Sequence, residues 1–283
     1  MHMNSAPSVR DYARPGTLAA ATELLAQGGW RVLAGGTDLY PGAGPGLPGR
    51  VLDLTGLPEL SGIMEGRGLR IGAATTWAAI AGTKLPPAAR ALQQAARQVG
   101  GQQVQNAGTI GGNLCNASPA ADGVPPLLAL EAEVELVSAA GVRRLLLAEF
   151  LLGPRRTALR PGEILAAVLI PEAALCGGSA FVKLGARSHL VISIAMVAAR
   201  VVLEGGRVTG AAIAVGSCSP VAVRLPTVEA ALVGASVAGA EGRVTAAEVQ
   251  AALSPIDDVR ATAGYRRAAV VELVRRAVAE AVA

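Results

Sequence analysis

The chain has 283 residues, of which 52% are hydrophobic and 16% charged, and its formal net charge is +4. This composition excludes a disordered chain, and the length exceeds what one hydrophobic core usually absorbs, so we expect two domains. The basic residues are scattered and aromatic residues make up only 2%, which argues against nucleic-acid binding. No uncharged apolar run reaches the roughly 18 to 20 residues that a membrane span needs.

The first ten residues contain no apolar core of the kind that a secretory signal carries, so we expect a cytoplasmic protein. Three cysteines, Cys115, Cys176 and Cys218, lie far apart in the sequence, without the close spacing of a zinc or iron–sulfur site. Their odd number also argues against a disulfide framework. We therefore expect the cysteines to be small buried side chains and the chain to carry no metal.

Helical and extended patterns alternate through the N-terminal third of the chain. A helix is predicted over residues 17–27, where Gly28 and Gly29 end it, and another over 87–99. Thr75 or Thr76 is predicted to cap the N-terminus of a further helix, which follows the strand at 69–73. Strands are predicted at 30–34, 51–54 and 69–73.

Later segments repeat this mixture and indicate an α+β fold. Extended patterns cover residues 133–137 and 164–170, and the Gly- and Ala-rich stretch 171–179 is a candidate linker. Beyond it, strands are predicted near 180–184 and 211–215, and an apolar segment covers 191–203. Helices are predicted at 227–233, 245–253 and 265–282.

Two Gly-Gly motifs stand out in the N-terminal half, AGGTDL at 34–39 and GTIGGN at 108–113. Glycines in series allow positive φ and a close approach of the backbone, so successive N–H groups can form a concave site for a phosphate. Two such turns facing each other predict a diphosphate site, with side-chain hydrogen bonds from Thr37, Asp38, Thr109 and Asn113. Taken singly, each motif could be an ordinary tight turn.

Together the motifs resemble the paired FAD signatures of the molybdopterin dehydrogenase flavoprotein family, which includes the medium subunit of carbon-monoxide dehydrogenase. The second motif continues as TIGGNLCNASPAAD over 109–122, and the likeness extends through LGPRRTALRPGEIL (152–165) and AFVKLGARSHLVIS (180–193). It ends in SPIDDVRATAGYRR at 254–267, so it spans nearly the whole chain.

The resemblance implies an FAD site made of two loops and three further residues. The first loop, which wraps the diphosphate, corresponds to Val32, Leu33, Ala34, Gly35, Gly36, Thr37, Asp38 and Leu39. The second loop corresponds to Thr109, Ile110, Gly111, Gly112 and Asn113. Asp122 matches an aspartate that contacts the cofactor, Leu165 an apolar residue beside the flavin, and Lys183 a lysine near the isoalloxazine ring, whose charge would tune the flavin potential.

Two positions depart from the family pattern. Val99 stands where relatives can carry an aromatic packing residue, and Gln105-Asn106-Ala107 stands where relatives often have an arginine. These differences concern flavin packing and partner contacts more than the two diphosphate loops.

The fold implied is a two-lobed FAD-binding domain of the PCMH type over residues 1–173, followed by a smaller α+β domain over 179–283. In the family, a large subunit oxidises the substrate at a molybdenum cofactor, and a small subunit passes the electrons through two [2Fe–2S] clusters to the FAD subunit. The final acceptor is NAD or a quinone-type molecule. The implied partners are these two subunits, in a dimer of heterotrimers.

Two other functions remain open from the sequence, a self-sufficient FAD-dependent reductase or oxidase of the same fold and a scaffold subunit without flavin. No acid–base pair or catalytic residue stands out in the sequence, which favours electron transfer. Asp257, Asp258 and Arg260 are interpreted as a helix cap with an ion pair, and His189 as structural.

Overall fold

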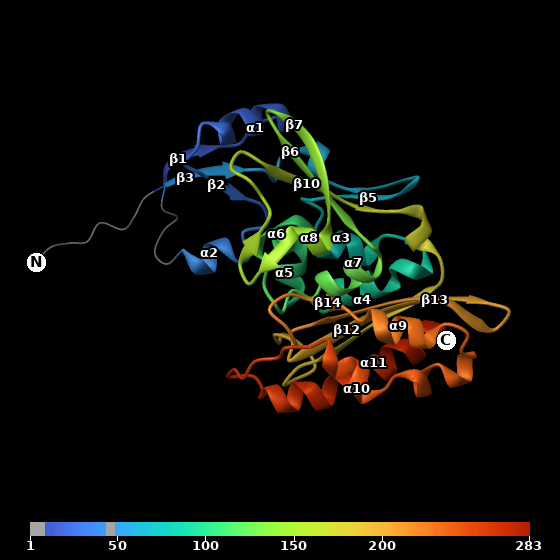
Figure 1. The fold of residues 1–283 in the computed structure, drawn as a ribbon. Helices are drawn as coiled ribbons and strands as arrows, with labels where there is room; N and C mark the ends of the chain where they lie inside the picture. The colour runs from blue at the N-terminus through green and yellow to red at the C-terminus, as the bar shows by residue number, and fades with distance from the viewer. Residues whose placement is uncertain (1–8, 44–48) are drawn as a thin grey trace, which may run out of the picture.

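The computed structural model describes residues 9–43 and 49–283, and it has an α+β fold with separate sheets in its N- and C-terminal parts (Figure 1). The prediction that the first ten residues carry no secretory signal concerns a segment that lies mostly outside the described residues. Most of the loop after Leu39 also lies outside them. Among the residues that are described, no helix has the length and apolar character required to cross a membrane.

A small parallel sheet opens the chain, in the order β1-β3-β2. Its elements are β1 (Val9–Ala13), α1 (Leu18–Ala26), β2 (Trp30–Leu33), α2 (Leu39–Gly42) and β3 (Gly49–Asp53). Helix α1 begins where the Thr17 hydroxyl accepts the amide of Ala20, as a capping threonine does. Its predicted extent is therefore confirmed to within a residue at each end.

The second sheet is antiparallel and has the order β4-β5-β10-β6-β7. Its strands are β4 (Ile63–Gly66), β5 (Gly68–Gly72), β6 (Glu133–Ser138), β7 (Gly141–Leu146) and β10 (Ile164–Ile170). Helices follow β5 and lead up to β6: α3 (Trp77–Gly82), α4 (Arg90–Ala96), α5 (Gln102–Ala107), α6 (Ile110–Asn116) and α7 (Val124–Ala129). After β7 come α8 (Leu147–Phe150), β8 (Leu151–Gly153) and β9 (Arg156–Thr157).

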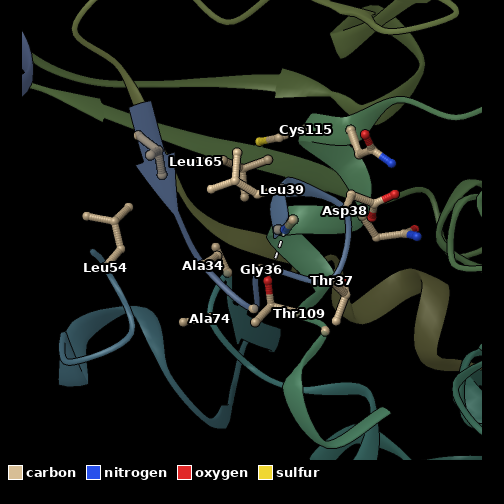
Figure 2. A pocket seen from close by; sticks show the side chains of 18 of the residues that line it. Ala34, Gly36, Thr37, Asp38, Leu39, Leu54, Ala74, Thr109, Cys115 and Leu165 are labelled. Carbon is tan, nitrogen blue, oxygen red and sulfur yellow. Dashed lines mark hydrogen bonds between the residues drawn. The ribbon is translucent and has the colours of Figure 1, made fainter. Parts of the chain in front are cut away.

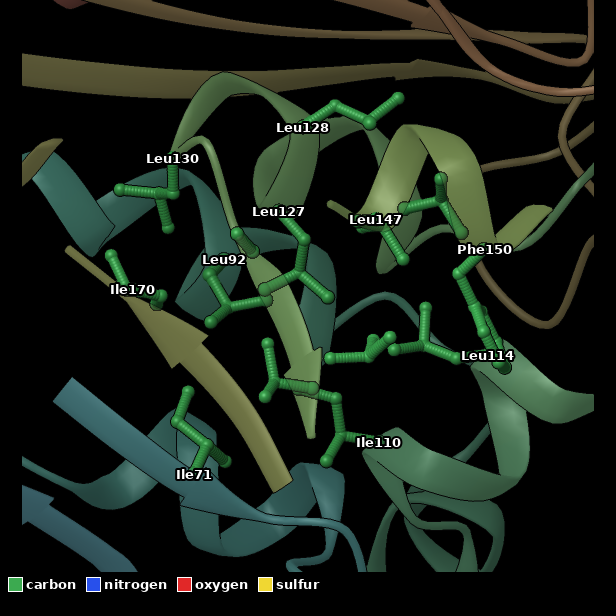
Figure 3. Close-up of a cluster of buried hydrophobic side chains, with 14 of the residues drawn as sticks. Ile71, Leu92, Ile110, Leu114, Leu127, Leu128, Leu130, Leu147, Phe150 and Ile170 are labelled. Atoms are coloured by element: carbon green, nitrogen blue, oxygen red, sulfur yellow. The ribbon is translucent and has the colours of Figure 1, made fainter. Parts of the chain in front are cut away.

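The largest hydrophobic cluster fills the space between this sheet and its helices (Figure 3). Leu127, Phe150 and Ile110 are fully buried within it. The predicted helix over 87–99 is wrong in length, because a short 3-10 turn at Pro87–Ala89 precedes α4 and the helix ends at Ala96, before Val99.

The C-terminal part is a four-stranded antiparallel sheet with helices on one face. The strands are β11 (Gly178–Leu184), β12 (Ala195–Glu204), β13 (Arg207–Gly216) and β14 (Val223–Arg224), and the helices are α9 (Pro226–Leu232), α10 (Ala246–Ala251) and α11 (Ala263–Val282). Short 3-10 turns lie at Pro58–Leu60, Glu172–Leu175, Val237–Gly239 and Glu241–Arg243.

The other face of the C-terminal sheet packs on α4 and α7 of the N-terminal part (Figure 1). Small side chains dominate this contact, with Ala91 and Ala95 on α4 meeting Phe181 of β11. Alanines let helix and sheet approach closely. The candidate linker 171–179 therefore joins two domains that pack directly against each other. Ala174, within the linker, is itself fully buried.

A loop before α11 is held by Asp258. Its Oδ1 atom accepts the amides of Arg260 and Ala261, and the guanidinium groups of Arg260 and Arg266 pair with the carboxylate at 3.0 and 2.7 Å. Asp257 accepts the amide of Ala263 at the start of α11. The interpretation of these residues as a cap with ion pairs is therefore confirmed.

Replacing Asp258 with Asn is expected to remove a pH-dependent part of the stability. Burial alone would raise the pKa of Asp258, but the amides of Arg260 and Ala261 and the two arginines outweigh it and lower this pKa to about 2. A depressed carboxyl pKa stabilises the fold above the unfolded pKa, and this stabilisation is lost as pH falls from about 4 to about 2. The free energy of unfolding of the wild type should therefore exceed that of Asp258→Asn by about 1 to 2 kcal/mol at pH 6, and this difference should disappear towards pH 2. Urea unfolding titrations of both proteins between pH 2 and pH 6 measure this difference. A difference that does not change with pH would contradict the prediction.

Candidate functional site

A cavity of about 490 Å³ lies where the small parallel sheet meets α3, α5 and α6 (Figure 2). Both Gly-Gly motifs contribute to its wall. The predicted site residues that line it are Val32, Ala34, Gly35, Gly36, Thr37, Asp38, Leu39, Thr109, Gly111, Gly112, Asn113 and Leu165. The tertiary structure thus brings together segments that are more than seventy positions apart in the sequence.

The first motif follows β2 directly and forms an open turn. Gly36 has φ of 70°, in the left-handed region that favours glycine, and its carbonyl accepts the amide of Tyr40. Gly35 lies so close to the chain before α6 that a Cβ there would sit 2.0 Å from the Ala107 carbonyl oxygen. Within the described residues, the amides of Gly35, Gly36, Thr37 and Asp38 donate no hydrogen bond. Four successive donors are thus available to a ligand.

The second motif is a helix start and not a facing turn, so the prediction of two similar phosphate nests is wrong here. Thr109 caps α6, and its hydroxyl accepts the amide of Gly112 at 3.0 Å. The amides of Ile110 and Gly111 donate to the carbonyls of Thr75 and Ala73. These donors are already used, because the segment 108–111 pairs with 73–77 to attach α6 to the end of β5.

The two glycines of the second motif have different roles. A Cβ on Gly111 would lie 2.7 Å from the Ala73 carbonyl oxygen, so only glycine permits this contact between α6 and the chain after β5. A Cβ on Gly112 would meet only the Thr109 hydroxyl, at 3.0 Å, and is otherwise free to project into the cavity. Gly111 therefore serves packing, while Gly112 keeps space for a ligand.

Asn113 places a polar group on the cavity wall without a protein partner. Its Oδ1 atom is buried and has no hydrogen bond to the residues that the structure describes. Buried amide groups are nearly always hydrogen-bonded, so this oxygen, which lies close to Gly123, is an unmet acceptor in the cavity wall. Leu33 and Ile110, also predicted as site residues, are buried in hydrophobic clusters and do not line the cavity.

The titratable groups of the cavity are not arranged for acid–base catalysis. Glu163 is held by Arg143 through two bonds of 2.6 and 2.7 Å, and this pairing lowers the pKa of Glu163. Cys115 lines the cavity and is exposed there, as is Cys176 elsewhere, so the prediction of buried cysteines is wrong for these two and right for Cys218. The protein around the sulfur raises the pKa of the Cys115 thiol. It is therefore a neutral thiol at pH 7 and not an activated nucleophile.

Asp122 and Lys183 pair with each other across the junction of the N- and C-terminal parts. The Lys183 Nζ donates to Asp122 Oδ2 at 2.6 Å and to the Gln98 carbonyl at 3.1 Å, and Ser193 donates to Asp122 Oδ1 at 2.5 Å. Both charged side chains are more than nine-tenths buried. Burial raises the pKa of Asp122, although Lys183 and Ser193 favour its charged form.

This buried pair is not part of the cavity lining but lies behind it. Gln98, which binds Lys183, precedes Val99 of the cavity wall, and Gly123, which follows Asp122, lies close to Asn113 Oδ1 and the Trp77 ring. The pair thus supports the wall from the side of the C-terminal domain.

Sequence reasoning missed part of the lining, chiefly apolar residues after β3 and β5 and the start of β10. Trp77 is the largest of these, and a rare tryptophan at the start of a helix was a usable signal. The lining residues not predicted include Leu54, Leu60, Ala73, Ala74, Trp77, Val104, Cys115, Asn116, Leu159 and Glu163. Most are small or aliphatic residues that no local pattern distinguishes from core.

Two family models match the chain. Residues 6–173 match the FAD binding domain in molybdopterin dehydrogenase, and residues 180–281 match the CO dehydrogenase flavoprotein C-terminal domain. The carbon monoxide dehydrogenase medium chain of Afipia carboxidovorans is 32% identical, with 97% of each chain covered. The putative xanthine dehydrogenase FAD-binding subunit of Escherichia coli is 31% identical, with 96% of each covered.

Solved structures agree along the same length. Reconstituted CO dehydrogenase from Oligotropha carboxidovorans superposes with a TM-score of 0.90 at 30% identity, covering 98% of this chain and 99% of the other. Quinoline 2-oxidoreductase from Pseudomonas putida gives 0.87 at 27% identity, with 98% of each covered. These matches, and a cavity built from both glycine motifs, show that the chain belongs to the FAD-binding medium subunits of the molybdenum hydroxylases.

Proposed function

We propose that this subunit receives electrons from the [2Fe–2S] clusters of a partner subunit and delivers them to NAD or a quinone-type acceptor. The observation that carries the proposal is the cavity, with four free backbone donors on one side and no acid–base pair among the described residues that line it. Such a site can hold a redox cofactor but offers no acid–base pair to move a substrate proton.

The residues present fit FAD. The amides of Gly35, Gly36, Thr37 and Asp38 would bind the diphosphate, the open space at Gly112 would admit it, and the Asn113 side chain, which lines the cavity, would bind a polar group of the cofactor. When bound, FAD exchanges one or two electrons, which links single-electron donors to two-electron acceptors.

The remaining site assignments are part of the same proposal. Leu165 would pack beside the flavin, and Lys183 with Asp122 would lie at the isoalloxazine end, behind Val99. Leu33 and Ile110 would act through the backbone of the two motifs, since their side chains belong to the core. The electric field of the Asp122–Lys183 pair would influence the flavin potential, because water screens a buried pair only weakly.

The assembly proposed is a heterotrimer with a molybdenum-cofactor large subunit and a [2Fe–2S] small subunit, doubled into a dimer of such trimers and located in the cytoplasm. Within the chain, residues 1–173 would be the FAD-binding domain and 179–283 the C-terminal domain. Full-length similarity to medium chains of multi-subunit dehydrogenases supports this arrangement.

A self-sufficient flavoenzyme fits the site less well. It would need an acid–base pair or a covalent link at the cavity, but Glu163 is held in its ion pair with Arg143, Asp38 is paired with no other titratable group among the described residues, and Cys115 carries a protonated thiol. In a flavin-free scaffold, the unpaired backbone amides of the first motif would have no ligand to bind.

Gly112→Leu is expected to abolish FAD binding while the protein stays folded. The added side chain projects into the cavity, and replacing a helical glycine favours the helix by about 0.5 to 1 kcal/mol. Released FAD per chain, measured by absorption after denaturation, should fall at least about ten-fold with an unchanged circular dichroism spectrum. Gly82→Leu, at the exposed end of α3 with open space at its Cβ, is the matched control and should keep its FAD.

Asn113→Leu separates ligand binding from stability. The amide oxygen is unpaired, so its removal should leave the urea midpoint of the FAD-free chain unchanged or higher. Losing one hydrogen bond to the cofactor should raise the FAD Kd by about 3- to 10-fold. Fluorescence titration with FAD measures the Kd, and an unaltered Kd together with lower stability would show that Asn113 serves the fold alone.

Electron delivery is tested with the purified FAD-loaded chain and the [2Fe–2S] subunit of the same organism. The flavin absorption should bleach when the dithionite-reduced, desalted [2Fe–2S] subunit is added, and NAD or a soluble quinone should restore it. The chain alone should not oxidise purines, aldehydes or N-heterocycles. Turnover of such a substrate by the isolated chain would establish a self-sufficient enzyme, and no flavin under any condition would leave the scaffold function.

A further inference from the structure

The buried carboxylate of Asp122 uses both of its oxygens, and each is bound by a residue of the C-terminal domain. Its Oδ2 atom accepts the Nζ group of Lys183 at 2.6 Å, and its Oδ1 atom accepts the hydroxyl of Ser193 at 2.5 Å. Lys183 lies in β11, and Ser193 lies in the segment that precedes β12. Two donors thus bind one carboxylate, and only the lysine was predicted as a site residue.

The surroundings of Ser193 are those of a residue that acts on Asp122. Ser193 is 1% exposed, and among the described residues its hydroxyl has Asp122 as its one hydrogen-bond partner. Charge-assisted bonds between a hydroxyl and a carboxylate have lengths of about 2.5 to 2.7 Å, so the distance is that of a donor facing an ionised carboxyl group. The hydroxyl takes the place of the water that a buried negative charge has lost.

The backbone beside Ser193 is held in place from two sides. The amide of Ile194 donates to the Leu184 carbonyl at 2.8 Å, and the Ile194 carbonyl accepts the guanidinium of Arg266. Arg266 is 3% exposed and is itself bound to Asp258 at 2.7 Å. The position of Ser193 is therefore set by the fold, which directs its hydroxyl before any ligand binds.

Burial, Lys183 and Ser193 together decide the charge of Asp122. Burial raises the pKa of Asp122, whereas the charge of Lys183 and the hydrogen bonds from Lys183 and Ser193 favour the carboxylate. With both donors in place, the pair carries one negative and one positive charge. Without the Ser193 hydroxyl, one buried oxygen would lose its donor, which favours protonation of Asp122. The positive charge of Lys183 would then have no counter-charge.

We infer that Ser193 is a positioning residue for electron transfer, which keeps Asp122 ionised and directed at Lys183 so that the pair has no net charge. The inference rests on the proposed function, in which this pair lies at the isoalloxazine end of bound FAD. A net positive charge there would stabilise the reduced, anionic flavin and raise its midpoint potential. Ser193 would thus set the potential without touching the cofactor, since it does not line the cavity.

The test compares the midpoint potential of FAD in the full FAD-loaded wild type and in Ser193→Ala, by spectroelectrochemical titration at pH 7. Ser193→Ala should favour the reduced flavin about ten-fold, which corresponds to a rise of about 30 mV for a two-electron couple. Its FAD content should equal that of the wild type, because Ser193 lies outside the cavity lining. An unchanged or lower potential would overturn the inference.

Ser179→Ala is the matched control. Ser179 is 2% exposed, and its hydroxyl also joins the two domains, because it accepts the amide of Ala91 at 2.9 Å and donates to the Pro87 carbonyl at 3.0 Å. This variant should lose stability in urea, as Ser193→Ala does, but it changes no contact of the charged pair and should keep the wild-type potential. An equal shift in both variants would mean that the potential responds to loosened domain packing in general, and the inference would be wrong.

A second series tests whether Ser193 acts through Asp122. Asp122→Asn removes the negative charge directly and should raise the potential at least as much as Ser193→Ala does. Adding Ser193→Ala to Asp122→Asn should then cause no further rise, because the hydroxyl no longer has a carboxylate to stabilise. Additive rises would show that Ser193 acts by another route, against the inference.

Failure of the proposed function gives a different result from failure of the inference. If the wild type binds no FAD, or if Asp122→Asn keeps the wild-type potential, the proposed site or its placement of the charged pair beside the flavin is wrong, and the inference fails with it. If Asp122→Asn raises the potential and Ser193→Ala does not, the proposed function stands and the inference alone is wrong. Ser193→Ala and its control decide the inference even where Asp122→Asn does not fold.

Discussion

The cavity depends on the close approach of three backbone segments, which is possible only because glycine stands at the contact points. The turn after β2, the end of β5 and the start of α6 meet where Gly35 lies against Ala107 and Gly111 against Ala73, at distances that admit no side chain. Hydrogen bonds between 73–77 and 108–111 hold the junction together. Because these segments cannot be separated by a Cβ, the cavity wall is continuous from the first motif to the second, and Gly112 is left facing open space.

A buried charged cluster connects this wall to the C-terminal domain. Asp122, Lys183 and Ser193 come from both parts of the chain and satisfy one another away from water. Such a pair adds little net stability, but losing one partner leaves an uncompensated buried charge at a cost of about 3 to 5 kcal/mol. The cluster therefore specifies how the two domains sit together, and through Gln98 and Val99 it couples that arrangement to the cavity.

The proposed electron-transfer function makes different demands from acid–base catalysis, and the residues of the cavity fit it. The cavity offers backbone donors and apolar walls, and of the two carboxylates that line it, Asp38 and Glu163, the latter is neutralised by Arg143. Such a binding site suits the proposed function, in which the chemistry would come from the cofactor and the electrons from a partner.

The sequence alone determined the fold class, the family and the two glycine motifs of the cavity wall, because glycine pairs act locally and leave a readable pattern, but it predicted only twelve of the 27 lining residues. It could not show that the second motif starts a helix whose amides are already used, since those acceptors, Ala73 and Thr75, lie far away in the chain. Nor could it show that Lys183 pairs with Asp122, or that Leu190 lies against Gly101. Those contacts join residues tens of positions apart, and only the packing of the two domains brings them together.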